Sequence, residues 1–160
     1  MASGISRSSR SATCDALIVL RHRLNFFALA LWWGSLTALG AWVVPILFIH
    51  MPSPAQAGTL AARLFSAQTW LGLICGLVCL VASRRLFSAL APSLNGLVLA
   101  AMLMALLLEL AIAPRILLRE NLALWHSLGS AMFLVQWACV GLALWKMMGQ
   151  PEQADIDNQG

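Results

Sequence analysis

The stretch that decides the fold is LFSAQTWLGLICGLVCLVAS (residues 64–83), which carries no charged side chain. Arg63 precedes it and Arg84 and Arg85 follow it, so the uncharged run has sharp limits. A helix needs roughly 20 mostly apolar residues to cross the hydrocarbon core of a bilayer. We therefore predict that this run crosses a membrane as a helix.

Three further runs of similar length have the same character, and one of them contains a single acid. Backbone N–H and C=O groups in lipid must be satisfied within their own segment, so continuous apolar runs form helices. A β-barrel would show short segments of alternating hydrophobicity instead. The predicted fold class is all-α, an integral membrane four-helix bundle. The four predicted spans are residues 26–48, 64–83, 94–113 and 122–145.

The composition agrees with a membrane protein. Apolar residues make up 61% of the 160 residues and charged residues 10%, against about 25% charged in a soluble domain. No glycine-rich phosphate loop or nucleophile motif is present, so we expect a protein that is not an enzyme. The formal charge of +4 comes from residues that flank the spans. The expected partner is therefore the lipid bilayer, and a nucleic-acid partner is not expected.

The chain is predicted to have three parts. Residues 1–14, rich in Ser and Arg, are expected to be a disordered leader, and residues 15–25 a short interfacial helix. The four-helix transmembrane domain is placed at residues 15–148. Residues 149–160 are expected to form a polar tail.

The basic residues are divided unequally between the two sides of the predicted bundle. Seven lie before the first span, in the second loop and after the last span, whereas three lie in the other two loops. By the positive-inside rule, both termini are predicted to lie in the cytoplasm, with the protein in the inner membrane. The seven are Arg7, Arg10, Arg21, Arg23, Arg84, Arg85 and Lys146, and the three are Arg63, Arg115 and Arg119.

Small residues four positions apart indicate where helices approach closely, because helix association in lipid depends on tight packing. We expect them to pack within the bundle, with a dimer interface as the alternative. Pro45 is expected to free the carbonyl of Ala41 and to bend the first span. The small residues are Ala30, Gly34 and Ala38 in the first span, and Gly72 and Gly76 in the second.

Glu109 is an acid inside the third span, and such an acid usually faces the bundle interior. Two interpretations are open. One is an ion or proton site that opens to the outer face, and the other is an ion pair with Arg63 or Arg115 that ties the helix ends together. We expect the ion pair. The polar groups predicted to gather at this extracytoplasmic end are Glu109, Arg63, Arg115, His126 and His50.

Cys75 and Cys79 are four residues apart and share one face of the second span. Two thiols are soft ligands, so copper or another soft metal is one interpretation. Small apolar cysteines that pack in a helix seam are the other. His50 and His126 could form an axial pair for a haem, but His50 stands in a loop. We expect no cofactor, with copper or another soft metal as the alternative.

Short motifs occur over residues 31–145, namely Pro45-Ile-Leu-Phe48, Met51-Pro52, Ala57-Gly58, Leu64-Phe65, Pro114-Arg115 and Trp125-His126 with Ser127 and Ser130. They resemble the transmembrane protein 205-like family, which overlaps bacterial proteins called domain of unknown function 4149. The resemblance implies a small four-helix membrane protein without catalytic activity, and a looser similarity to copper-resistance membrane proteins agrees with the metal alternative. Such proteins usually carry an amide in spans three and four, where this chain has Glu109 nearby and the apolar Phe133 or Val135.

Three functions are compatible with these patterns. The first is a small, non-enzymatic, multi-pass inner-membrane protein with a polar cluster at its extracytoplasmic end. The second is a transporter or export factor for a small cation or soft metal. The third is an assembly or scaffold subunit that binds a membrane-protein partner or a second copy of the chain.

Overall fold

The structure, a computed structural model, describes residues 5–83, 94–118 and 121–149. Every regular element in these residues is a helix, as predicted. Two of the elements, labelled η1 and η2, are short π-helical segments that interrupt longer helices. The elements are α1 (Ile5–Ala38), η1 (Leu39–Val43), α2 (Val44–His50), α3 (Pro54–Ala82), α4 (Leu94–Leu107), η2 (Leu108–Ile112), α5 (Ala113–Leu117) and α6 (Leu122–Met148).

Four helical segments are long and apolar enough to cross a membrane, which confirms the number of predicted spans. Each overlaps one predicted run, and the helices extend further than the uncharged runs do. In the second span, α3 begins ten residues before the predicted start, at Pro54. The four segments are Val19–His50, Pro54–Ala82, Leu94–Ile116 and Ala123–Met148.

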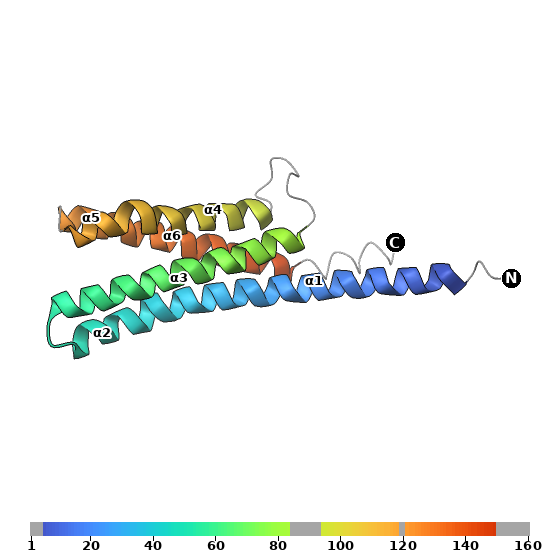
Figure 1. The fold of residues 1–160 in the computed structure, drawn as a ribbon, viewed down its shortest axis with the longest axis horizontal. Helices are drawn as coiled ribbons and strands as arrows, with labels where there is room; N and C mark the ends of the chain where they lie inside the picture. The colour runs from blue at the N-terminus through green and yellow to red at the C-terminus, as the bar shows by residue number, and fades with distance from the viewer. Residues whose placement is uncertain (1–4, 84–93, 119–120, 150–160) are drawn as a thin grey trace.

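The helices form one bundle in which α1 packs beside α3 and α4 beside α6 (Figure 1). Contacts between α1 and α6 and between α3 and α4 close the bundle. The turns from α2 to α3 and from α5 to α6 lie at the same end, which we call the hairpin end. At the opposite end, which we call the open end, α1 continues past the other three helices.

The start of α1 differs from the sequence-based expectation. A disordered leader over residues 1–14 and a separate interfacial helix over residues 15–25 were expected. Instead α1 runs without interruption from Ile5 into the first span. Residues 1–4 lie outside the described part, as does the tail from residue 150 onwards. The described part of the leader is therefore the first part of a long helix.

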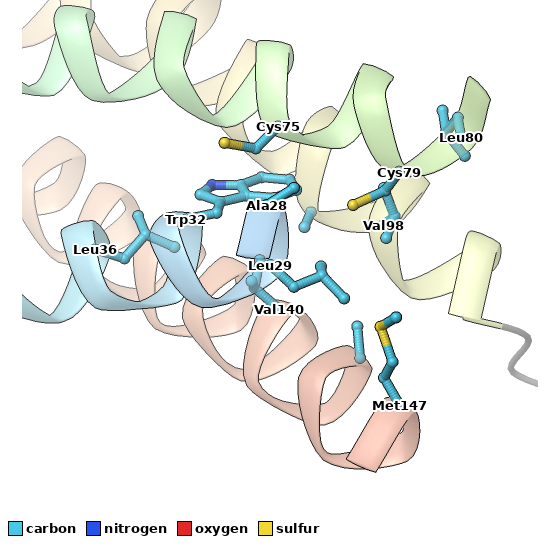
Figure 2. Packing of buried hydrophobic residues seen from close by; sticks show 12 residues of the cluster. Ala28, Leu29, Trp32, Leu36, Cys75, Cys79, Leu80, Val98, Val140 and Met147 are labelled. Carbon is cyan, nitrogen blue, oxygen red and sulfur yellow. The ribbon is translucent and has the colours of Figure 1, made fainter. Parts of the chain in front are cut away.

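The core is built around Trp32 of α1, whose side chain is fully buried and lies against α3 (Figure 2). A Cβ atom on Gly72 would come within 2.5 Å of the Trp32 Nε1 atom. A Cβ atom on Gly76 would come equally close to the sulfur of Met102 on α4. The second-span glycines therefore serve packing within the bundle, as expected. The largest other fully buried side chains are Leu29, Leu36, Cys79, Val98 and Val140.

The small residues of the first span behave differently. Gly34 and Ala38 are exposed on the outer surface of the bundle, and no atom lies within 4 Å of the place where a Gly34 Cβ would stand. The expectation that this stripe packs within the bundle is therefore wrong for these two residues. Trp32 and Leu36 take the inward positions of this stretch of α1.

A π-segment and a proline interrupt the first span together. The N–H of Val44 donates to the carbonyl of Leu39, five residues back, and Pro45 follows without an N–H. In this register the proline removes the donor for the carbonyl of Gly40, one residue before the Ala41 predicted from the sequence. The predicted interruption of the helix at Pro45 is therefore present, but it begins one residue earlier than expected.

The third span is interrupted in the same way, which the sequence analysis did not predict. The N–H of Ala113 donates to the carbonyl of Leu108, and Pro114 follows. The missing N–H of Pro114 removes the intrahelical donor for the main-chain oxygen of Glu109. Glu109 therefore lies where a main-chain hydrogen bond of the helix is missing.

The chain forms two helical hairpins, the first from α1 to α3 and the second from α4 to α6. Both hairpins contain a helix, a π-segment, a proline two residues after that segment, and then a long uninterrupted helix. Phe65 and Gln68 occupy the same positions in α3 as Phe133 and Gln136 occupy in α6, counted from the first residue of each helix. The rings of Phe65 and Phe133 meet edge to face, with centroids 5.5 Å apart. Both hairpins run in the same direction, so the fold is a parallel tandem repeat about an axis along the bundle.

Candidate functional site

Glu109 connects the two repeats. It lies in η2, in the second repeat, and its side chain is partly buried. The hydroxyl of Ser66, on α3 in the first repeat, donates a hydrogen bond to Oε1 of the Glu109 carboxylate. Among the described residues, Glu109 forms no ion pair with Arg63 or Arg115, so the expected clamp does not form. A neutral hydroxyl, rather than a cation, is the group bonded to this acid.

Arg115 has a different partner from the one predicted. Its guanidinium carbon lies 4.4 Å from the centroid of the Trp125 ring, which is a cation–π contact. Both residues belong to the second repeat, on α5 and α6, and Arg115 is exposed. The contact therefore joins α5 to α6, and the Arg115 guanidinium lies on the Trp125 ring and not on the Glu109 carboxylate.

The other three residues of the predicted polar cluster lie near the hairpin end but do not converge. Arg63 is exposed on α3, beside an open hollow of that helix lined by Gln56 and Thr59. The Nδ1 atom of His50 lies 3.0 Å from the carbonyl of Ile46 in its own helix. His126 is exposed on α6. These side chains form an exposed polar rim around the bundle end.

A second polar layer lies deeper in the bundle and joins the first repeat internally. Nε2 of Gln68 on α3 donates to Oγ of Ser35 on α1 at 2.9 Å. The Ser35 hydroxyl in turn donates to the carbonyl of Trp32 at 2.8 Å. Gln68 is only 8% exposed.

The same layer joins the first repeat to the second. Nε1 of Trp137 on α6 donates to Oγ1 of Thr37 on α1 at 2.9 Å, and Thr37 donates to the carbonyl of Trp33 at 2.8 Å. The rings of Trp33 and Trp137 lie 5.4 Å apart. Two neighbouring turns of α1 are therefore bonded to α3 on one side and to α6 on the other.

Gln136 on α6 is a further buried polar residue, and it was not predicted as a site residue. Its side chain is 2% exposed. The resemblance implied an amide in the fourth span and pointed to Phe133 or Val135 as its replacement. The fourth span does contain an amide side chain, Gln136. A glutamine within an uncharged span was the signal that would have found both Gln136 and Gln68.

The two thiols of the second span are packed in the core beside Trp32 (Figure 2). Cys75 is 5% exposed and Cys79 is 1% exposed. The Cys79 thiol lies 3.9 Å from the carbonyl of Asn25, a weak hydrogen bond. Within the described ranges no three His, Cys, Asp or Glu side chains gather as a metal site would require. The geometry of these cysteines is that of core residues.

A third polar group lies toward the open end. Nδ2 of Asn25 donates to the hydroxyl of Ser83 at 3.3 Å, and Oδ1 of Asn25 is buried without a partner. Asn95, at the start of α4, is also buried. Polar side chains thus occur at three levels among the described residues of the bundle, and one of them, Glu109, is a carboxylate.

The comparisons with known proteins identify one family. Residues 27–121 match the family model described as Domain of unknown function (DUF4149). Neither the curated proteins nor the solved structures include a match to the chain. The matched residues make up more than half of the chain and contain Ser66, Gln68 and Glu109. On this evidence the chain belongs to the DUF4149 family.

Proposed function

We propose that this protein is a non-enzymatic inner-membrane transporter that carries a small cation through the interface between its two repeats. The observation that carries the proposal is the hydrogen bond between Ser66 of the first repeat and Glu109 of the second. A carboxylate inside a span is costly, and it is usually tied to a substrate or ion pathway unless a basic partner neutralises it. Glu109 has a hydroxyl partner and no ion pair with Arg63 or Arg115.

The broken helices support the same proposal. Transporters built from repeats commonly bind their cargo at the repeat interface, beside helices that are discontinuous at corresponding positions of the two halves. Here η1 with Pro45 and η2 with Pro114 are such a pair. The breaks free main-chain oxygens near the interface. A small cation is the cargo that such oxygens and a carboxylate favour.

The orientation is part of the proposal. Seven basic residues on the side of the termini against three on the other side favour two cytoplasmic termini. The hairpin end, with Glu109 near it, then faces away from the cytoplasm. We also propose kinship with the transmembrane protein 205-like proteins, on the motifs quoted above.

The test is cation flux into vesicles that contain the purified protein. Wild-type protein should move Na⁺, K⁺ or H⁺ down an imposed gradient, followed with an ion-sensitive dye. Glu109→Gln keeps the shape and the hydrogen bond from Ser66 but removes the charge, so flux should fall at least tenfold. Ser130→Ala is the matched control, because Ser130 bonds only the carbonyl of His126 in its own helix. Wild-type flux no greater than that of empty vesicles would refute the proposal.

A scaffold subunit is the second candidate, and one observation favours it. Gly34 and Ala38 leave a smooth surface on the outside of α1, against which another helix could pack closely. Gentle solubilisation followed by co-purification would then recover a stable membrane-protein partner. Gly34→Leu should release that partner without changing the stability of the bundle. A protein that purifies alone from its native membrane would count against this candidate.

A further inference from the structure

We propose that the outer face of α3 binds an anionic phospholipid near the hairpin end. Its phosphate lies on Arg63, its headgroup lies in the hollow beside that residue, and one acyl chain follows the apolar side chains further along the helix. The site is on the outside of the bundle and uses neither Glu109 nor Ser66, so it is independent of the proposed transport function. The hollow is lined by Ala55, Gln56, Thr59, Leu60 and Arg63.

The first observation is that the charge of Arg63 is not neutralised within the described part of the chain. Arg63 is exposed, and no described carboxylate pairs with it, because Glu109 is bonded to Ser66 instead. An arginine at the edge of a membrane span extends its guanidinium toward the headgroups. The anion that a bilayer supplies at that depth is the phosphate of a lipid.

The second observation is the depth of the hollow in the membrane. The uncharged run 64–83 is about 30 Å long as a helix, which equals the thickness of the hydrocarbon core. Headgroups add about 6 Å on each side of that core. Because α3 continues outward from Arg63 to Pro54, its turns with Thr59 and Gln56 lie at the level of the headgroups and just beyond them. The hollow, with a volume of about 380 Å³, opens at this level.

The third observation is the chemistry of the hollow. Gln56, Thr59 and Arg63 are three and four residues apart, so they share one side of α3. Arginine binds phosphate oxygens through two parallel N–H groups. The Thr59 hydroxyl donates to the carbonyl of Ala55 at 3.0 Å and can still accept, and the amide of Gln56 can both donate and accept. These groups suit the hydroxyls of a glycerol headgroup. None of the described lining residues is a carboxylate that would pair with an ammonium headgroup, which favours phosphatidylglycerol over phosphatidylethanolamine.

The fourth observation is an apolar face that continues from Arg63 along the same side of α3. Trp70, Ile74 and Leu77 follow Arg63 at helical spacing, and each of these apolar side chains is more than half exposed. The rise from Arg63 to Ile74 is about 16 Å, close to the depth of one leaflet, about 15 Å. An acyl chain attached to a phosphate at Arg63 therefore runs over Trp70 and Ile74. Free phosphate would make no use of this apolar face, so the two parts together favour a lipid.

The experiment counts the lipid that stays bound to the protein. Purified protein in mild detergent is mixed with equal amounts of phosphatidylglycerol and phosphatidylethanolamine that have the same acyl chains, and bound lipid is measured by native mass spectrometry. We expect retained phosphatidylglycerol to exceed phosphatidylethanolamine at least fivefold. Arg63→Gln should lower its retention at least tenfold. Arg115→Gln is the matched control, because it removes the same charge from an exposed arginine that lies on Trp125.

A second pair of variants tests the acyl chain. Trp70→Ala should lower retention of phosphatidylglycerol severalfold, whereas Trp145→Ala, which removes an exposed tryptophan from α6, should leave it unchanged. Equal losses in Arg63→Gln and Arg115→Gln would overturn the inference, because they would show only general attraction of anions. Displacement of the lipid by inorganic phosphate, with no effect of Trp70→Ala, would also overturn it. So would a second copy of the chain in place of lipid, released by Arg63→Gln. None of these results depends on cation flux.

Discussion

Replacement of Gly72 by alanine should destabilise the bundle, because it brings a methyl group into the ring of Trp32. The added Cβ would lie 2.5 Å from Nε1, 2.9 Å from Cε2 and 3.1 Å from Cζ2 of that ring. The indole is rigid and fully buried, so α1 and α3 must separate or Trp32 must leave its position. Overpacking of a filled core costs about 1–3 kcal/mol. We expect a loss of unfolding free energy of this size.

Gly34→Ala is the matched control in the same bundle. Nothing lies within 4 Å of its Cβ position, so the change adds only helix propensity, about 1 kcal/mol in favour of alanine. That term is shared by both variants, and the difference between them isolates the contact with Trp32. The assay is unfolding by SDS in mixed micelles, followed by far-ultraviolet circular dichroism. Equal stability of Gly72→Ala and Gly34→Ala would refute the packing that we describe.

Three further predictions concern the contact between Arg115 and Trp125, the two thiols of the second span and the orientation. Trp125→Leu removes the ring beneath Arg115 and should lower the unfolding free energy by about 0.5–1 kcal/mol in the same SDS assay, whereas no change would mean that the cation–π contact is absent. The double variant Cys75→Ala with Cys79→Ala should keep cation flux within twofold of wild type, and lost flux would restore the soft-metal interpretation. A reporter domain fused after Gln56 should lie outside the cytoplasm, and one fused after Gly149 should lie inside it. The reverse result would mean that the protein has the opposite orientation.

The spans were predictable because a membrane-crossing helix requires a long apolar run without charged residues, and such runs can be recognised in the sequence. Arg63 and Arg84 flank the second uncharged run. The helix α3 nevertheless begins earlier, at Pro54, because a helix can continue into the polar boundary of the membrane. Its start is capped by Ser53, whose hydroxyl accepts a hydrogen bond from the N–H of Gln56. The bend at Pro45 was predictable from the missing N–H. The π-segment before it was not, since a π-register depends on the packing around it.

The site was predictable only in part. Glu109 is conspicuous because it is an acid in an apolar run, but its partner is a neutral serine in the preceding span. Charge alone favoured Arg63 or Arg115 as the partner. The choice between them and Ser66 depends on which face of α3 turns inward, and the uniformly apolar run does not specify that face. Gln136 was overlooked because its neighbours suggested an apolar substitution of the amide.

The most direct test of the central claim, a polar site that joins the two repeats, is a double-mutant cycle between Ser66 and Glu109. Wild type, Ser66→Ala, Glu109→Met and the double variant are compared by SDS unfolding in the same lipid. The structure predicts a coupling of about 0.6 kcal/mol, and up to about 1.7 kcal/mol, as measured for hydrogen bonds between membrane helices. Ser130→Ala paired with Glu109→Met should show no coupling. Strictly additive losses for Ser66 and Glu109 would contradict the site described here.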